Sequence, residues 1–373
     1  MRSQRQAIVS VINDLVTDQR VNRTCLTLTE AGYDVLLVGR QMRKSLPLPQ
    51  RPYRTKRMRL LFETGVPFYV EFHFRLFLVL LFTKADLLFA NDLDTLMPNY
   101  IASKLKGAEL IYDSHEYFTG VPELQNHPNK QRTWKWVEKR FIPRLKHMLT
   151  VNESIAGLYH QEFGIDVKVV RNLPMRRDMP TTLSRKALNL PEDKSILLLQ
   201  GAGINIERGS EEAIQGMQFI DNALLLIIGG GDAIDSLKQL ATELNLNDKV
   251  RFIPKLPFEQ LMQYTVLADI GLTLDKDTNI NYRYSLPNKL FDYIHAGLPV
   301  LASPLIEVKK IIDQYQVGEC IDSHDPREIA LKTQTMLADK AKLAQYKANA
   351  LKASAELCWE NEKEVLTEVL KSL

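Results

Sequence analysis

The sequence predicts an α/β protein built from two parallel sheets, each covered by helices on both faces. Its 373 residues are too many for one ordinary domain and suit two. Short, nearly continuous apolar runs alternate with segments of helical periodicity, which is typical of parallel strands joined by helices. A stretch of prolines and mixed charge over 172–194 divides this alternation into two series.

The first series predicts an N-terminal domain. After its first strand, Val21, Cys25 and Leu28 have helical spacing, and Gly32 ends that helix. A further helix is predicted over 97–107. The strands of this domain are predicted at 7–12, 34–39, 85–92, 108–116, 147–154 and 167–174.

The second series predicts a C-terminal domain of the same kind, followed by a long helix over 342–373. We expect domains over 1–175 and 176–345, with the helix 346–373 crossing back to the N-terminal domain. Ligands of parallel sheets bind at the carboxyl ends of the strands, so two such domains are expected to face a cleft. The strands are predicted at 194–203, 223–232, 249–254, 269–274 and 299–303, and the helices at 210–220, 233–245, 258–268 and 285–297.

Composition excludes several classes of protein. A net charge of +3 is too small to indicate a nucleic-acid partner. The three cysteines, Cys25, Cys320 and Cys358, are widely spaced, which favours reduced thiols in a cytoplasmic protein over a disulfide framework or a zinc site. The start of the sequence leads directly into a strand, so we expect no signal peptide.

One stretch, residues 66–90, is strongly apolar but is interrupted by Glu71, His73 and Arg75. Its uninterrupted apolar part is too short to cross a bilayer. Two interpretations stay open: a helix packed inside its domain, or a face that rests on a membrane, helped by the basic segment 51–59. The second predicts a peripheral membrane contact through 51–83.

The loops after the strands of the first series carry candidate functional residues. The first loop has no G-x-G-x-x-G or P-loop pattern, and Thr17 or Asp18 can cap the helix that follows. In "ANDLDTLMPN", Asp94 or Thr95 is the expected helix cap, which leaves Asp92 at the strand tip as a functional candidate.

The next loop, "YDSHEYFTG", places Asp113, His115 and Glu116 close together. A histidine beside carboxylates can act as a general base or bind a hydroxyl group, and the alternative is a turn residue whose polar groups are satisfied locally. These residues lack metal-ligand spacing with any other His or Cys, so a zinc site is excluded.

The second series carries a pattern that suits a nucleoside diphosphate. Arg208 and Gly209 precede a predicted helix, where free amides and a guanidinium together can hold a phosphate. The triple glycine of "IIGGGD", with Gly230 at its centre, leaves room for a flat ligand or forms a tight turn.

The segment "SLPNKLFDYIHAGLPVLAS", 285–303, predicts a helix with Ser285 as its N-cap. Asn288, Lys289 and Asp292 share the face opposite the apolar stripe. Lys289 and the helix amides suit a diphosphate, and Asp292 is placed to accept hydrogen bonds from a ribose diol. A solvated surface pair is the alternative.

Taken together, these residues resemble the retaining glycosyltransferases of family 4 (glycosyl transferases group 1), which have the GT-B fold. The resemblance is strongest over 196–303 and includes "ANDLDTL" and "YDSHE". It implies that Arg208 binds the donor diphosphate, that Asp292 binds the donor ribose, and that main-chain groups near Ile253 contact the base. The site residues so predicted are, for catalysis, Asp92, His115 and Glu116, and, for donor binding, Arg208, Gly209, Gly230, Ile253, Asn288, Lys289 and Asp292.

The sequence departs from the family pattern at three positions. Tyr284 replaces the first of two Glu residues spaced eight apart, Asn91 replaces a His, and Ala202 replaces an Arg for which Lys289 or Arg283 is the expected substitute.

The resemblance implies transfer of a sugar, with retention, from a UDP- or GDP-type nucleotide sugar to a glycan or lipid-linked acceptor in cell-surface polysaccharide synthesis. It implies no cofactor and no required metal. The cysteines and the start of the sequence predict a cytoplasmic protein, and the membrane-resting interpretation of 51–83 would place it at the inner face of the membrane. The alternatives are a nucleotide-sugar 2-epimerase and a non-catalytic partner subunit with the same fold.

Overall fold

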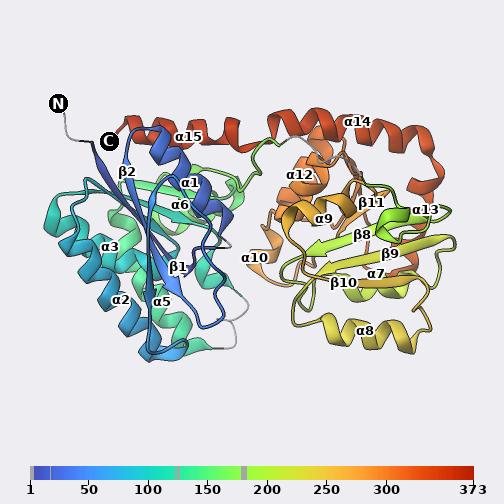
Figure 1. Ribbon diagram of the computed structural model, residues 1–373, viewed down its shortest axis with the longest axis horizontal. Coiled ribbons are helices and arrows are strands. Elements are labelled where there is room, and N and C mark those ends of the chain that lie inside the picture. The colour runs from blue at the N-terminus through green and yellow to red at the C-terminus, as the bar shows by residue number, and fades with distance from the viewer. Residues whose placement is uncertain (1–3, 17, 122–123, 125–126, 178–182) are drawn as a thin grey trace. The chain divides into compact units, whose positions relative to one another are not determined.

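The computed structural model describes residues 4–16, 18–121, 124, 127–177 and 183–373. The chain divides into two compact units (Figure 1). The first unit comprises Met1–Asn172 together with Trp359–Leu373, and the second comprises Leu173–Cys358. Part of the stretch predicted to link the domains, and Thr17, lie outside the described residues.

The first unit is built on a seven-stranded parallel sheet of order β3-β2-β1-β4-β5-β6-β7. Its central strands are buried almost throughout, as the apolar runs predict. The strands are β1 (Gln6–Asp14), β2 (Asp34–Gln41), β3 (Arg54–Arg59), β4 (Leu87–Asn91), β5 (Glu109–Ser114), β6 (His147–Thr150) and β7 (Lys168–Val169). The helices are α1 (Gln19–Glu30), α2 (Gly65–Phe82), α3 (Leu93–Lys106), α5 (Pro128–Phe141) and α6 (Glu153–Phe163), with short 3₁₀ turns at Phe118–Gly120 and Ile142–Arg144.

Helix α1 forms as the sequence predicts. The Asp18 side chain accepts a hydrogen bond from the Val21 amide at 3.0 Å and so caps the helix. Val21, Cys25 and Leu28 are buried, and Gly32 follows the helix with a φ of +88°. The predicted amphipathic pattern is confirmed.

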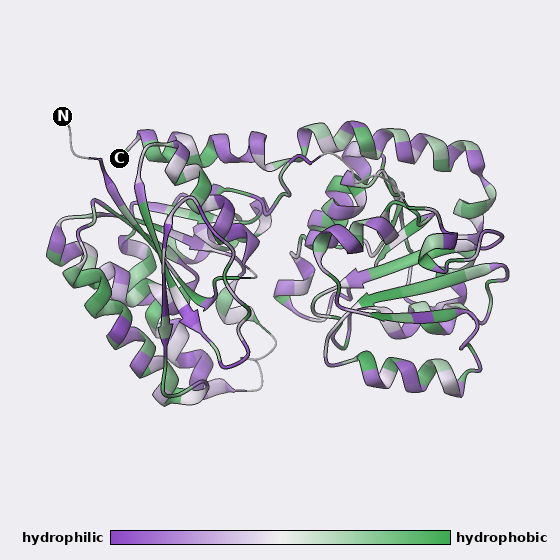
Figure 2. Ribbon diagram, viewed as in Figure 1, coloured by the Kyte–Doolittle hydropathy of each residue, from purple (hydrophilic) through white to green (hydrophobic). Residues whose placement is uncertain are grey.

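The second unit is built on a six-stranded parallel sheet of order β10-β9-β8-β11-β12-β13. Hydrophobic residues continue along β8 and β9, as Figure 2 shows. The strands are β8 (Ser195–Gly201), β9 (Ala223–Gly229), β10 (Val250–Pro254), β11 (Ile270–Thr273), β12 (Val300–Ala302) and β13 (Gly318–Cys320). The helices are α7 (Ser210–Gly216), α8 (Ile234–Glu243), α9 (Phe258–Thr265), α10 (Ile280–Arg283), α11 (Asn288–His295), α12 (Ile306–Tyr315), α13 (Pro326–Ala338) and α14 (Lys340–Glu356), with a 3₁₀ turn at Lys186–Leu188.

The predicted single helix over 342–373 is wrong, because the chain forms α14 and then a separate helix α15 (Trp359–Lys371). Helix α14 packs in the second unit through Ala350 and Ala353. Helix α15 lies beside α1 in the first unit (Figure 1), where the Trp359 indole donates to the Thr27 hydroxyl at 3.2 Å. The segment that returns to the first unit therefore begins at Trp359 rather than at 346.

Helix α2 contains the apolar stretch singled out in the sequence. Phe68, Phe72, Leu76 and Leu80 form one buried stripe at a spacing of four residues, and the helix packs against α3. Among the described residues, α2 is the one helix long and apolar enough to cross a membrane, and 28% of it is buried.

Candidate active site

The carboxyl ends of β4 and β5 bring the first group of predicted residues together. Asn91 pairs with Asp113 across the two strands, so Asp92 and His115 follow at the same edge of the sheet. Asp92 has a φ of +59°, which is strained for a residue with a side chain. Its carboxylate does not cap α3 but accepts a hydrogen bond from the His115 amide at 3.0 Å.

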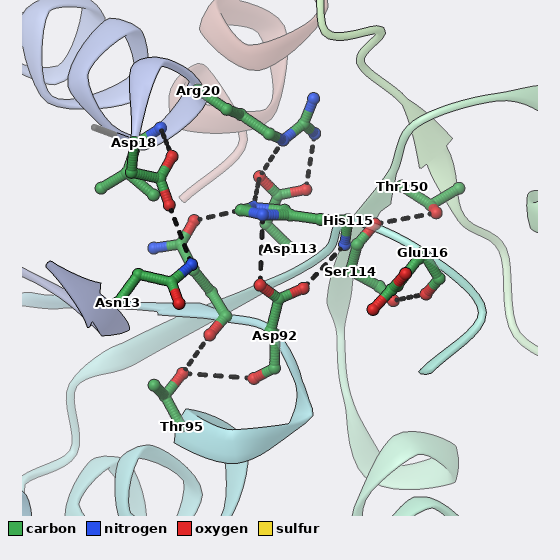
Figure 3. Close-up of polar contacts among 12 residues, drawn as sticks. Asn13, Asp18, Arg20, Asp92, Thr95, Asp113, Ser114, His115, Glu116 and Thr150 are labelled. Carbon is green, nitrogen blue, oxygen red and sulfur yellow. Dashed lines mark hydrogen bonds and ion pairs between the residues drawn. The ribbon is translucent and has the colours of Figure 1, made fainter. Parts of the chain in front are cut away.

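The His115 imidazole lies between two carboxylates, as Figure 3 shows. Its Nδ1 is 3.2 Å from Asp92, and its Nε2 is 3.3 Å from Asp113. Burial lowers the pKa of His115, but the charges of Asp92 and Asp113 outweigh this effect and raise the pKa to about 10. A raised pKa favours the protonated ring, which donates from both nitrogens, so this environment favours hydroxyl binding over general-base catalysis.

Arg20 anchors this group from α1. Its guanidinium donates to both carboxylate oxygens of Asp113, at 2.9 and 2.7 Å, and to the Val170 carbonyl at 2.6 Å. Burial alone would raise the pKa of Asp113, but Arg20 and His115 together hold it well below its ordinary value. Figure 3 shows the resulting row of alternating charges, Arg20, Asp113, His115 and Asp92. Sequence reasoning missed Arg20, because its partner Asp113 lies 93 residues away in the sequence.

The expected helix cap at Asp94 or Thr95 is wrong. The Thr95 hydroxyl donates to the carbonyl of Asn91 at 2.7 Å, and the Asp94 side chain is buried. Burial, followed by the nearby charges of Asp92 and Glu116, raises the pKa of Asp94 to about 8. Glu116 is exposed, and its carbonyl accepts a hydrogen bond from the Ser114 hydroxyl at 2.7 Å. This hydrogen bond stabilises the turn, and the Glu116 side chain is exposed at the surface of the first unit.

The second unit brings Arg208 and Lys289 together through a residue that sequence reasoning missed. Arg208 contacts one carboxylate oxygen of Asp275 at 2.9 Å, and Lys289 contacts the other at 3.3 Å. Asp275 is fully buried, and the two cations outweigh that burial and lower its pKa. Arg208 also lies over the Tyr282 ring, 4.4 Å from its centre. One carboxylate therefore orients two cations and leaves a net positive charge.

Arg283, the other expected substitute for the missing arginine, does not join this pair. It contacts Asp277 at 2.9 Å in an exposed ion pair. Lys289 is therefore the candidate that the structure places beside Arg208.

Gly209 and Gly230 have different structural roles. Gly209 has a φ of +72°, and a Cβ added there would lie 2.1 Å from the Leu274 carbonyl oxygen. A Cβ added at Gly230 meets no atom within 4 Å, so this backbone borders open space. Ile253 lies on the neighbouring strand β10, where it pairs with Ile228 of β9.

Helix α11 starts later than predicted, at Asn288, and Pro287 rather than Ser285 occupies its N-cap position. The predicted Ser285 cap is wrong because Ser285 belongs to the turn after α10, where its amide donates to the Tyr282 carbonyl at 3.1 Å. Asn288 is exposed in the first turn of α11.

Asp292 is held by the strand beside it. Gln200, at the end of β8, donates to the Asp292 carboxylate at 3.2 Å and accepts from the Thr265 hydroxyl at 2.8 Å. Next to Asp292, the Tyr293 hydroxyl accepts from the Gln200 amide at 3.2 Å. These bonds fix the carboxylate at the carboxyl end of β8.

Some buried polar side-chain atoms of the second unit make no hydrogen bond within the described part of the chain. Arg208 Nε, Ser210 Oγ and Ser285 Oγ are among them. Buried polar groups are normally paired, so a polar ligand is a natural partner for them. In the same described part, no group of three His, Cys, Asp or Glu residues has the arrangement of a metal site.

Two family models match the chain, Glycosyltransferase Family 4 over residues 19–173 and Glycosyl transferases group 1 over residues 181–353. A D-inositol 3-phosphate glycosyltransferase of Thermobispora bispora is 26% identical over 50% of this chain and 45% of its own length, so the chain spans about half the length of this curated relative.

Among solved structures, sucrose-phosphate synthase of Thermosynechococcus elongatus has a TM-score of 0.82 at 18% identity, covering 99% of both chains. Anabaena HepE, solved with UDP-glucose, has a TM-score of 0.74 at 15% identity, covering 99% of this chain and 100% of that one. These likenesses show the GT-B fold. The chain belongs to glycosyltransferase family 4, the glycosyl transferases of group 1.

Proposed function

We propose that this protein transfers a sugar, with retention of anomeric configuration, from a nucleoside-diphosphate sugar to a glycan or lipid-linked acceptor in cell-surface polysaccharide synthesis. The observation that carries the proposal is the pair of cations, Arg208 and Lys289, oriented by the buried Asp275. Two cations on one carboxylate suit a diphosphate, because they leave net positive charge where a leaving group gains negative charge.

The other donor contacts follow from the surrounding residues. The Asp292 carboxylate, fixed by Gln200, accepts hydrogen bonds from the ribose diol. The open backbone at Gly230 admits the ligand, and main-chain groups near Ile253 contact the base. Asn288, in the first turn of α11, borders the diphosphate. The solved HepE complex with UDP-glucose supports uracil as the first base to test.

The proposed reaction needs no covalent enzyme intermediate. The bond between the anomeric carbon and the diphosphate oxygen breaks while the acceptor oxygen bonds to that carbon from the same face. The acceptor hydroxyl proton moves to the departing diphosphate oxygen. Arg208 and Lys289 stabilise the charge that develops there, which is the charge that a metal ion would otherwise neutralise.

On the acceptor side, we assign Asp92 as the group that accepts the hydrogen bond of the acceptor hydroxyl. His115, as an imidazolium, holds the Asp92 carboxylate and can donate to the acceptor. Glu116, on the turn that follows, contacts more distant acceptor hydroxyls. In this proposal the enzyme works in the cytoplasm.

Donor binding is tested first, by calorimetry and thermal shift of the full chain with UDP, GDP, dTDP and ADP and their sugars. We expect one base to bind, and Arg208→Ala and Asp292→Ala to weaken that binding tenfold or more. Arg283→Ala is the matched control, since this exposed arginine pairs only with Asp277 among the contacts described. Absence of binding to every nucleotide would overturn the proposal and favour a non-catalytic subunit.

Transfer is tested with the bound donor, lipid-linked acceptors and D-inositol 3-phosphate, the last chosen from the relative's name. We expect a product with the donor's anomeric configuration by NMR, at the same rate with EDTA. An epimerised nucleotide sugar formed without acceptor, and without release of nucleoside diphosphate, would instead identify a 2-epimerase. Tyr284, at the position of the family's first Glu, makes that control necessary.

A further inference from the structure

The outward face of α2 is apolar where a soluble helix is normally polar. Val66, Val70 and Phe74 follow one another at a spacing of four residues, and their exposed fractions are 72%, 63% and 62%. At 100° per residue this row lies opposite the buried stripe that packs in the core. The helix is therefore apolar on both sides, and only one side is covered within the described chain (hydropathy in Figure 2).

The loop before α2 extends this apolar surface. Leu61 and Phe62 are exposed, and both backbone amides donate to the Glu71 carboxylate, at 2.8 Å and 3.1 Å. Glu71 lies on α2 between Val70 and Phe72, so these bonds hold the loop against the helix. We define the α2 face as Leu61, Phe62, Val66, Val70 and Phe74.

Basic side chains lie at the loop end of the α2 face and beside β3. Arg75 pairs with Glu71 at 2.7 Å and donates to the Arg59 carbonyl at 2.9 Å, which brings the exposed end of β3 beside the helix. The Arg43 amide donates to Glu63 at 3.1 Å, so Arg43 and the exposed Lys44 lie at the loop end of the face. Glu63 and Glu71 both take part in these contacts: Glu63 accepts the hydrogen bond from the Arg43 amide, and Glu71 pairs with Arg75.

We propose that the α2 face docks on a membrane surface that contains anionic lipids, with α2 lying in the plane of the interface. Apolar residues bordered by arginine and lysine match the boundary between acyl chains and negatively charged headgroups. A second copy of the chain is a poorer partner, because two basic rims would repel each other across a symmetric contact.

The same helix is poorly placed to cross the bilayer. Its 18 residues span about 27 Å at 1.5 Å per residue, slightly less than a typical hydrocarbon core of about 30 Å. Its buried stripe is also committed to packing in the first unit. A helix held on one side by its own domain can enter a membrane only with the other side.

The test is co-sedimentation of the full chain with vesicles of phosphatidylcholine, alone or mixed with phosphatidylglycerol. We expect binding to the mixed vesicles that weakens as salt rises, because the basic rim contributes through screened charges. The double variant Val70→Glu/Phe74→Glu is expected to lose binding at least tenfold. Leu331→Glu/Leu351→Glu, at exposed leucines of the second unit, is the matched control and should bind like the natural chain.

The remaining outcomes also decide the proposal. The melting temperature of Val70→Glu/Phe74→Glu should be unchanged. Lys44→Gln/Arg59→Gln should weaken binding to the mixed vesicles and should not change binding to vesicles of pure phosphatidylcholine. Equal binding by all variants, or none by the natural chain, would overturn it. So would a dimer that Val70→Glu/Phe74→Glu dissociates, because the face would then serve self-association. Nucleotide binding by the second unit is independent of these results.

Discussion

Replacing Asp113 by Asn removes one negative charge from the buried row of Arg20, Asp113, His115 and Asp92 without changing the size of the side chain. The Arg20 and Asp113 side chains are only 3% and 2% exposed. Leaving a buried guanidinium without its carboxylate costs about 3–5 kcal/mol, since the charge is no longer compensated in a poorly polarisable interior. We therefore expect Asp113→Asn to lower the free energy of unfolding of the first unit by that amount.

The chain offers a direct assay for this unit. All three tryptophans, Trp134, Trp136 and Trp359, belong to the first unit. Urea unfolding followed by tryptophan fluorescence thus reports that unit alone. Asp34→Asn is the matched control, because Asp34 pairs with Arg54 at the surface, with 34% and 55% exposed, and such pairs contribute under about 1 kcal/mol.

The same variant should change the titration of His115. With one of its two carboxylates neutralised, the pKa of His115 should fall from about 10 toward its ordinary value, as measured by NMR of the imidazole protons. The reasoning is refuted if Asp113→Asn destabilises the unit no more than Asp34→Asn does, or if the His115 titration does not move.

Two further predictions concern Asp94 and the glycines of the second unit. The pKa of Asp94 is about 8 in the folded chain, against 3.8 for an ordinary aspartate, so the folded state binds an extra proton between these values and its stability falls as pH rises from about 4 to about 8. Asp94→Asn should remove this part of the pH dependence of urea unfolding, and parallel pH profiles for variant and natural chain would contradict the assignment. Gly209→Ala should destabilise the second unit, by calorimetry, because its Cβ would meet the Leu274 carbonyl at 2.1 Å. Gly230→Ala should leave the melting temperature unchanged and weaken nucleotide binding, and an equal loss of stability in both variants would contradict this difference.

Much of the fold could be predicted because local patterns determine it. Apolar runs mark β1, β4, β8 and β9, since strands of a parallel sheet are buried on both faces. Asp92 and His115 could be expected to meet because both follow adjacent parallel strands. The edge strand β3 was missed, because its sequence RTKRMR is mostly basic and lacks the apolar run of a central strand.

The partners of the site residues could not be predicted, because they come from distant parts of the chain. Arg20 and Asp113 are 93 residues apart, and Arg208 and Asp275 are 67 residues apart. Nothing in the local sequence around Asp275 indicates that it joins two cations. The predicted start of α11 was wrong for a related reason: Ser285 is a good cap by type, but its backbone already forms the turn after α10.

The return of α15 to the first unit has a consequence for synthesis on the ribosome. Residues up to Asn172 emerge first, yet the Trp359 indole that bonds Thr27 and the Glu362 carboxylate that pairs with Arg171 at 2.7 Å follow only after the whole second unit. The second unit is continuous in sequence and can complete its fold earlier. The first unit therefore starts to emerge first but completes its fold last. Until α15 has been synthesised, the surface of α1 that it covers stays exposed and accessible to chaperones.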